Sequence, residues 1–422
     1  MCGAFRRVAG YPFRFIMKHV LNYSYMHAVD ADGYVWTQLP VELLFAEDWQ
    51  LLGKHIELPS DAWHAFNLRF KGRSILRLRG HLDLYESFMR GQVRTDDYLA
   101  FWRAIHETRG LPLPDDASTL HRRHVQYLAF QQHLAAGDLA PLTATVIFDE
   151  ATHRFVVDDG HHRISFLIRR GLRLIPARVP YDQFQRYVNI HNAWNIATFL
   201  EQNKIREVYC PLLHPLVPRL SVCRDTTSGS RLDRILYFLG DYKSTGTILD
   251  IGCNGGFYTH HFLRDGADAV GVDTHKSHIS LARQLSALYR LPDVFHHADV
   301  TELMVGKKYE AALFLTVLYH WISEGPSSYH PRLQRLHDCV EDFILWESGH
   351  DPASEKSLLM AYGKFTRYEC LGVTYGTGRT RELGVFIRPG SRLDEAIGTC
   401  TTGTLRSDGR SFQSEFPRAM NV

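Results

Sequence analysis

The chain has 422 residues, of which 45% are hydrophobic and 22% are charged, a composition typical of a soluble globular protein with two or three domains. Its formal net charge of +2 is too small to indicate binding to nucleic acid or to a membrane by itself. The seven cysteines are scattered and form no CxxC pair, which argues against a disulfide framework or a structural zinc and favours a reducing cytoplasm.

Residues 1–110 carry no motif that can be attached to chemistry. Apolar residues at helical spacing predict helices over Leu82–Met89 and Asp97–Thr108, within a mostly helical, irregular region. The first twenty residues lack the apolar run and cleavage site of a signal peptide, and no stretch approaches the ~18 apolar residues of a membrane span. We therefore expect a cytoplasmic protein without a transmembrane segment.

Residues 111–190 are more regular and predict a small α+β domain. A helix is expected over His121–Ala135, followed by strands over Leu142–Phe148 and Arg154–Val157, a helix over His161–Arg170 and a strand over Leu174–Val179. Linker helices should occupy 191–229. From 230 to 390 strands and helices alternate, which predicts a parallel sheet covered on both faces, and 391–422 should form a tail.

The turn before the second helix of the small domain has the sequence Asp159-Gly160-His161-His162-Arg163. Gly160 permits a tight turn, and the helix start after it offers amide groups to an anion. Arg163 can make two hydrogen bonds to a phosphate, and Asp159 and His161 would lie beside it. The alternative is a turn in which Asp159 caps the helix and Arg163 forms a surface ion pair.

Six arginines gather within residues 161–190 against one acid, Asp182. They indicate either an anion-facing patch or solvated side chains on a helix face. The arginines are Arg163, Arg169, Arg170, Arg173, Arg178 and Arg186.

The strongest motif is a buried strand that runs into a glycine turn and then a helix. The turn comprises Asp250, Gly252, Cys253, Asn254 and Gly255, and a turn of this kind lets the backbone approach a ligand closely.

Later strand ends in the same domain carry further polar groups. Asp273 follows the turn by about twenty residues, where an acid can accept hydrogen bonds from ribose hydroxyls. Asp299 could meet an adenine amino group, and Thr316 ends the fourth strand. The carboxyl ends of parallel strands meet at one edge of the sheet, so these side chains should surround one ligand.

His320 follows this strand and is the candidate catalytic base for a hydroxyl acceptor, with Tyr319 as a possible orienting group. The alternative is a histidine that only packs at a strand end. Glu347 ends a later strand and could face the acceptor or serve the structure. An acceptor with an anionic phosphate oxygen would need no base.

The order and spacing of these motifs closely resemble the class I S-adenosylmethionine (SAM)-dependent methyltransferases, over residues 230–390. The resemblance implies a Rossmann-like fold with SAM as cofactor. It implies that Asp250, Gly252 and Gly255 shape the methionine pocket, that Asp273 takes the ribose and that Asp299 takes the adenine. The open alternatives are an NAD-binding Rossmann domain and a fold that binds nothing.

Residues 118–182 resemble the ParB/sulfiredoxin fold, and the Asp-Gly-His-x-Arg form is most similar to its free-serine kinases. That resemblance implies nucleotide phosphates and metal, as ATP with magnesium, around Asp159, His161 and Arg163. Those kinases also use a glutamate on the preceding segment, and His121–Ala135 contains none.

The leading hypothesis is therefore a bifunctional enzyme that phosphorylates and then methylates a sugar, a glycan terminus or a small hydroxyl compound, capping a phosphate as its methyl ester. A second hypothesis gives the ParB-like domain only a nucleotide- or nucleic-acid-binding role. A third is a non-enzymatic SAM-binding scaffold. We expect no metal cluster of the protein's own, and the sequence leaves the acceptor and the oligomeric state open.

Overall fold

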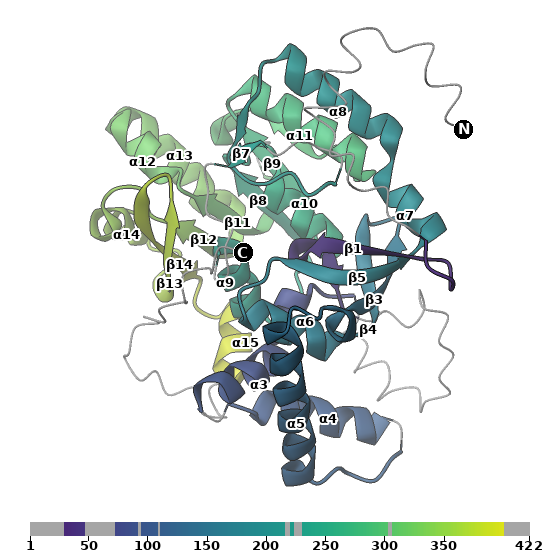
Figure 1. The fold of residues 1–422 in the computed structure, drawn as a ribbon. Helices are drawn as coiled ribbons and strands as arrows, with labels where there is room; N and C mark the ends of the chain where they lie inside the picture. Colours follow the sequence, from purple (N-terminus) through teal and green to yellow (C-terminus); the bar gives the residue numbers. More distant parts are fainter. Residues whose placement is uncertain are drawn as a thin grey trace, which may run out of the picture. The chain divides into compact units, whose positions relative to one another are not determined.

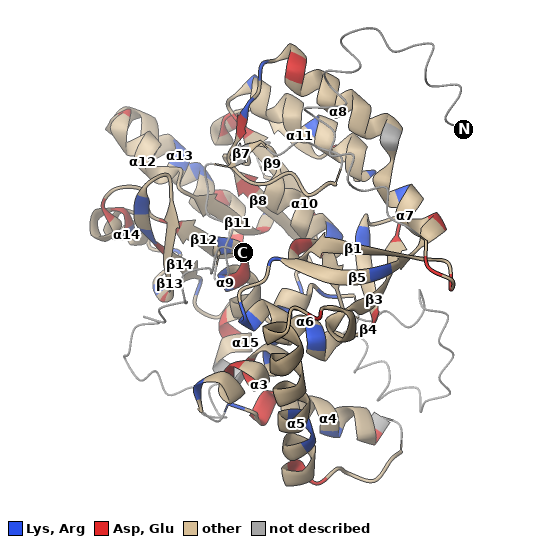
Figure 2. Cartoon of the chain, in the orientation of Figure 1, with Lys and Arg blue, Asp and Glu red and all other residues tan. Residues whose placement is uncertain are grey.

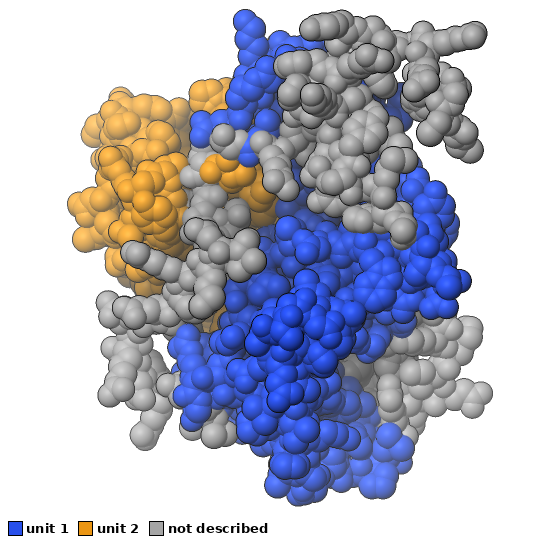
Figure 3. Space-filling model, in the orientation of Figure 1, with its two compact units in different colours: residues 1–208, 212–221, 288–290 blue, residues 209–211, 222–287, 291–422 orange. Residues whose placement is uncertain are grey.

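The structure is a computed structural model that describes residues 29–46, 72–91, 94–108, 110–215, 220–222, 230–302 and 306–400. The chain divides into two compact units (Figure 3). Unit 1 contains residues 1–208, 212–221 and 288–290, and unit 2 contains residues 209–211, 222–287 and 291–422. Each unit has its own sheet and is considered by itself.

Unit 1 is built on a five-stranded mixed sheet (Figure 1). Its order is β1-β5-β3-β4-β2, with β1 (Tyr34–Pro40), β2 (Leu44–Phe45), β3 (Ala144–Asp149), β4 (Arg154–Asp159) and β5 (Leu174–Pro180). The helices are α3 (Arg79–Arg90), α4 (Asp96–Thr108), α5 (Asp116–Ala135), α6 (His161–Arg169), α7 (Tyr181–Val188) and α8 (Ile190–Gln202).

The predicted helices and strands of unit 1 are present, with three differences. The sequence predicted a mostly helical start and missed two strands. β1 pairs antiparallel with β5 along its whole length, and β2 pairs with β4. Helix α5 begins earlier than predicted, because Asp115 caps it by accepting a hydrogen bond from the Ser118 amide. Asp159, expected in the turn, is the last residue of β4.

Unit 2 contains a seven-stranded sheet in the order β10-β9-β8-β11-β12-β14-β13. These strands are β8 (Thr247–Ile251), β9 (Asp268–Asp273), β10 (Phe295–His297), β11 (Tyr309–Leu315), β12 (Val340–Glu347), β13 (Arg367–Gly376) and β14 (Arg379–Ile387). The helices are α9 (Arg231–Leu239), α10 (Phe257–Arg264), α11 (Lys276–Tyr289), α12 (Leu318–Ser323), α13 (Pro326–Cys339), α14 (Pro352–Met360) and α15 (Arg392–Cys400). The two-residue strands β6 (Glu207–Val208) and β7 (Ser221–Val222) precede them in the chain.

The sheet of unit 2 is doubly wound and Rossmann-like. From β10 to β12 all neighbouring strands are parallel, as predicted, but β14 runs antiparallel to both β12 and β13. The strand order reverses at β8, which lies between β9 and β11. Ligands of open α/β sheets bind outside the carboxyl ends of the strands at such a point. The fold therefore places the predicted glycine turn at the expected ligand site.

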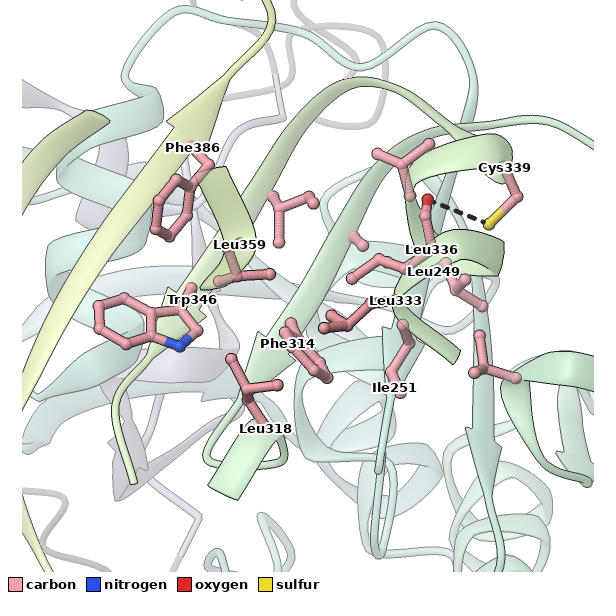
Figure 4. Packing of buried hydrophobic residues seen from close by; sticks show 14 of the residues in the cluster. Leu249, Ile251, Phe314, Leu318, Leu333, Leu336, Cys339, Trp346, Leu359 and Phe386 are labelled. Atoms are coloured by element: carbon pink, nitrogen blue, oxygen red, sulfur yellow. Dashed lines mark hydrogen bonds between the residues drawn. The ribbon is translucent and has the colours of Figure 1, made fainter. Parts of the chain in front are cut away.

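A large apolar cluster holds β8, β11 and β12 to the helices after them (Figure 4). Phe314 and Trp346 belong to it and are fully buried. Helices α13 and α14 contribute Leu333, Leu336 and Leu359. This packing fixes the strand ends on which the site depends.

The predicted tail begins instead with an ordered helix. Leu393 in α15 is buried, and Asp394 forms an ion pair with Arg367 at 2.6 Å. The apolar spacing within 392–400 overrides the small polar residues that suggested a tail. Residues 401–422 lie outside the described residues.

Candidate functional site

At two positions of the glycine turn after β8, any side chain would clash with its neighbours. Gly252 has φ +70°, and a Cβ there would lie 2.8 Å from a methyl carbon of Val317. Gly256 has φ +77°, and a Cβ there would lie 2.5 Å from the ring of Phe295. A Cβ at Gly255 would make only ordinary contacts, the nearest at 3.4 Å from a methyl carbon of Leu281. The fold thus needs glycine at 252 and 256, whereas it could hold a side chain at 255.

The side chains of the turn do not all face the ligand edge. Cys253 packs its thiol with Ile279 and Phe295, and burial raises the pKa of that thiol, so its backbone alone is available to a cofactor. Asn254 has φ +49° and accepts a hydrogen bond from the Gly255 amide at 2.7 Å. Its own amide donates to Asp273.

Asp250 is buried beneath the turn. Its Oδ2 accepts a hydrogen bond of 2.7 Å from the Thr259 hydroxyl, which ties the end of β8 to α10. Burial raises the pKa of Asp250 to about 6, although the hydrogen bonds from Thr259 and the charge of Arg231 oppose that rise. Asp250 thus shapes the pocket by fixing the turn.

Asp273 is the carboxylate at the end of β9. It accepts hydrogen bonds from the amides of Asn254 at 3.0 Å and His275 at 2.8 Å, and from the His278 ring at 3.2 Å. Burial pushes its pKa up, but His278 and these amides outweigh it and hold the pKa below the ordinary value. Asp273 is therefore an ionised acceptor at neutral pH.

Asp299 lies just after β10, and both of its oxygens have protein partners. One oxygen accepts from the amide and hydroxyl of Thr301, each at 2.9 Å, and the other accepts from Arg332 at 2.8 Å. Two carboxylate oxygens offer about four acceptor positions. The geometry leaves Asp299 room for one further donor and fixes its orientation.

Thr316 directly follows β11 and has a conformation that is unusual for a β-branched residue, with φ +64°. Its hydroxyl donates to the carboxylate of Glu347 at the end of β12, and its amide donates to the Glu347 carbonyl at 3.1 Å. Thr374 donates a second hydroxyl hydrogen bond to Glu347. Such strain persists only where surrounding contacts impose it, and it gathers at functional sites.

Arg231, at the start of α9, is a residue that sequence reasoning missed. It is 2% exposed and forms an ion pair of 3.2 Å with the buried Glu347. Its guanidinium lies 5.0 Å from the ring centre of Tyr258 and 3.4 Å from the Thr316 hydroxyl. Its Nε and Nη2 are buried without a hydrogen-bond partner among the described residues. Nothing in the local sequence pattern marked Arg231.

Glu347, which the sequence left between an acceptor contact and a structural role, is 0% exposed. Its oxygens are taken up by Arg231, Thr316 and Thr374. It therefore holds Arg231 rather than facing an acceptor.

His320 lies in α12 and is exposed. Its ring lies 3.9 Å, centre to centre, from that of Tyr319, which in turn meets the ring of His350 edge-on at 4.8 Å. Burial lowers the pKa of His320, Arg381 and His350 lower it further, and Glu324 opposes them. A neutral imidazole at the sheet edge can accept a proton, as the predicted base requires.

In unit 1 the turn at Gly160 brings Asp159 and Arg163 together. Gly160 has φ +116°, and a Cβ there would lie 2.9 Å from that of Ala144. Arg163 pairs with Asp159 and donates to the Thr143 carbonyl at 2.6 Å. The structure thus contains the surface ion pair weighed as the alternative, while Gly160 rather than Asp159 stands at the helix cap.

His161 and His162 differ in their surroundings. The His162 ring packs against those of His81 and Tyr98, and its Nε2 lies 3.3 Å from the Tyr98 hydroxyl. Burial lowers the pKa of His162 well below the ordinary value. The His161 ring lies 6.3 Å from His81, at the edge of this cluster.

Most of the six arginines in 161–190 serve ion pairs within unit 1, so the anion-facing patch is largely neutralised. Acidic and basic residues are accordingly scattered along the ribbon in Figure 2. The pairs are Arg163–Asp159, Arg169–Asp83, Arg169–Glu86, Arg173–Glu42, Arg178–Asp30, Arg178–Asp32 and Arg186–Asp182.

Among the described residues no group of three or more His, Cys, Asp or Glu side chains could hold a metal ion. Within the same ranges no helix has both the length and the apolar character needed to span a membrane.

Comparison with protein families identifies the centre of unit 2. Residues 248–337 match the family model described as "Methyltransferase domain", and this stretch includes the glycine turn, Asp273, Asp299 and His320. The chain carries a methyltransferase domain. This domain makes the protein a transferase. No curated protein matches the chain.

Solved structures give low identities. A structure of the bifunctional kinase-methyltransferase WbdD is 20% identical, with a TM-score of 0.37 over 46% of this chain and 46% of that chain. Magnesium protoporphyrin IX methyltransferase (ChlM) from Synechocystis PCC 6803 with bound SAM is 16% identical, with a TM-score of 0.29 over 38% of this chain and 92% of that chain. The chain thus spans less than half the length of that WbdD structure.

Proposed function

We propose that unit 2 binds SAM and transfers its methyl group to an acceptor. The observation that carries this proposal is the buried guanidinium of Arg231 with two unpartnered nitrogens near the glycine turn. The charge of Arg231 is paired with Glu347, but two buried N–H groups without hydrogen-bond partners are costly, and an anionic group that arrives with a ligand would satisfy them. SAM offers such a group in its methionine carboxylate.

The residues around Arg231 suit the remaining parts of SAM. Asp273 is ionised, and His278 is the one of its three donors that is a partly exposed side chain, so ribose hydroxyls can take that position. Asp299 keeps room for the adenine amino group. When bound, SAM supplies an electrophilic methyl group on a sulfonium, and Thr316 stands beside the place proposed for it.

The acceptor proposed from the sequence is a sugar, a glycan terminus or a small hydroxyl compound. For a hydroxyl, His320 would take the proton as the oxygen attacks. The Tyr319 ring lies tilted against the imidazole and would orient it. For an acceptor that is already anionic, such as a phosphate oxygen, no base is needed.

The test is SAM binding by Asp273→Ala. Loss of hydrogen bonds to a charged group should weaken binding by about 10- to 100-fold. The matched control is Asp268→Ala, the exposed first residue of the same strand, which should bind normally. Calorimetric titration with SAM measures both, and equal affinities of the two variants would overturn the proposal. SAM binding without any methylated product would favour the scaffold hypothesis instead.

A phosphotransferase activity of unit 1 is a separate proposal, which rests on the sequence resemblance of the turn from Asp159 to Arg163 and on the position of that turn at the start of α6. Against it stands the absence of a glutamate from α5. Incubation with labelled ATP and magnesium against sugars and serine tests it, with Asp159→Asn as the variant. Transfer lost in that variant would support it. Nucleic-acid binding that weakens with salt and with Arg163→Gln would favour the binding-module hypothesis.

A further inference from the structure

A cationic cluster lies beyond His320 on the carboxyl edge of the unit 2 sheet. The Tyr319 ring contacts both His320 and His350, and the guanidinium of Arg381 lies 5.8 Å from its centre. The exposed Arg379 contacts Nδ1 of His350. Four cationic or protonatable side chains therefore surround one tyrosine.

The cluster is held in place by buried groups. Gly349 is in contact with Tyr319 so closely that a Cβ there would lie 2.3 Å from the tyrosine side chain. The buried carboxylate of Glu355 accepts hydrogen bonds from the amides of Gly349 at 2.9 Å and His350 at 3.1 Å. Arg381 donates to the Gly349 carbonyl at 3.0 Å. The position of His350 is thus imposed by the fold.

One acid and three basic or protonatable groups act on His320. The charged groups that influence it are Glu324 on α12, Arg381 on β14, His350 after β12 and His275 after β9. The carboxylate of Glu324 is already engaged by Arg332 and by the Ser328 hydroxyl at 2.6 Å. The described surroundings of His320 therefore favour a negatively charged ligand.

We propose that Arg379 and His350, backed by Arg381, form an oxyanion-binding acceptor subsite, so that the methyl acceptor carries a phosphate monoester or a carboxylate. This inference rests on the proposed methyl transfer and names its substrate class. Arg and imidazole groups donate charge-assisted hydrogen bonds to such oxygens. The uncharged hydroxyl acceptors allowed above would bring no negative charge to these two arginines.

Methyl transfer to an anionic oxygen needs no proton acceptor. An anionic oxygen of the acceptor forms a bond to the methyl carbon, the bond from that carbon to sulfur breaks, and the electron pair remains on sulfur. The products are a methyl ester that has lost one negative charge and neutral S-adenosylhomocysteine. His320 then contacts the anion rather than removing a proton, and release of the less charged ester from the cationic cluster is favoured.

The test is calorimetric titration of the full chain saturated with S-adenosylhomocysteine. The probes are phenyl phosphate, phenylacetate and neutral benzyl alcohol. Binding of either anion but not of the alcohol is expected, and the anion that binds distinguishes a phosphate from a carboxylate acceptor. Arg379→Gln and His350→Gln should each weaken that binding about tenfold. Arg388→Gln, an exposed arginine that pairs with Glu341, is the matched control and should bind normally.

Three outcomes overturn the subsite: none of the probes binds, the alcohol binds as well as the anions, or Arg379→Gln and His350→Gln bind like Arg388→Gln. Binding of S-adenosylhomocysteine is measured first, in each variant. Its failure in the unaltered chain would refute the proposed function itself, and normal binding with no anion response would refute only the subsite. Mass analysis for a methylated phenyl phosphate or phenylacetate adds a readout of transfer.

Discussion

At the scale of single residues, buried charge dominates the site of unit 2. Asp250, Glu347 and Arg231 are each 3% exposed or less, yet each carries an ionisable group. Ionisable groups are rarely buried unless they are paired or functional. Glu347 and Arg231 are paired, and Asp250 is stabilised by the Thr259 hydroxyl.

The titration of Asp250 should be visible in stability. Its pKa of about 6 in the folded chain lies above the value of 3.8 for an unfolded one. Between these values the folded chain retains a proton that the unfolded chain releases, so the free energy of unfolding falls as the pH rises from about 4 to about 6. In the unaltered chain this fall should amount to about 3 kcal/mol, and it should be absent from Asp250→Asn.

Urea unfolding of both proteins across this pH range measures the difference. Asp268→Asn, which removes an exposed acid from β9, should keep the profile of the unaltered chain. Parallel profiles for Asp250→Asn and the unaltered chain would contradict the prediction.

Two variants should separate the contribution of Arg231 to stability from its contribution to SAM binding. Arg231→Met leaves Glu347 buried and unpaired, which should cost about 3 kcal/mol of stability. Adding Glu347→Gln removes that charge and should restore much of the loss, while SAM binding stays weak. Thermal unfolding and SAM titration of the single and double variants measure the two effects. Recovery of SAM affinity in the double variant would exclude Arg231 as a ligand.

At the scale of elements, the glycine turn is governed by two separate constraints. Gly256 combines a positive φ with a clash against Phe295, whereas Gly266 has φ +80° and open space around its Cα. Gly266→Ala should therefore lower the free energy of unfolding by only about 1 kcal/mol, the cost of the positive φ alone. Gly256→Ala should cost about 2–3 kcal/mol, because Phe295 must also move. Denaturant unfolding compares the two, and equal losses would show that the clash relaxes freely.

The sequence predicted elements where periodicity and turn residues agree. Strands β8, β9, β11 and β12 and the helix after the glycine turn are all present where the motif residues predicted them. The sequence missed β1 because its seven residues pair with β5, more than a hundred residues away, and local pattern does not record such a partner. The reversed direction of β14 was missed because the alternation of strands and helices was extended to residue 390, whereas β13 and β14 form an antiparallel hairpin.

The candidate site was predictable only in part. Asp250, Asp273 and Asp299 belong to strand ends, whose common edge follows from the fold class. Arg231 and Arg379 come from a helix start and a hairpin with no motif around them, and their roles depend on tertiary neighbours. Cys253 shows the converse, since a residue inside the motif turns its side chain into the core.

At the scale of the whole molecule, the two units should respond to different ligands. SAM that binds unit 2 at 100 times its dissociation constant would stabilise it by about 2.7 kcal/mol. Hydrogen exchange should then slow in β8, β9 and β11, while the strands of unit 1 keep their rates. ATP with magnesium should affect unit 1 if the phosphotransferase proposal holds. Exchange that slows equally in both units with SAM alone would show that they unfold together.

The carboxylate of Glu355 has a wider consequence for the rim of the sheet. It accepts hydrogen bonds from the amides of Gly349 and His350 and from the indole N–H of Trp346, the last at 3.2 Å. These hydrogen bonds hold the irregular segment after β12 in place. A rim that is ordered before its ligand arrives loses little conformational entropy on binding. Such a surface discriminates by shape and charge already in place, and it should reject acceptors that could only be reached by rearranging it.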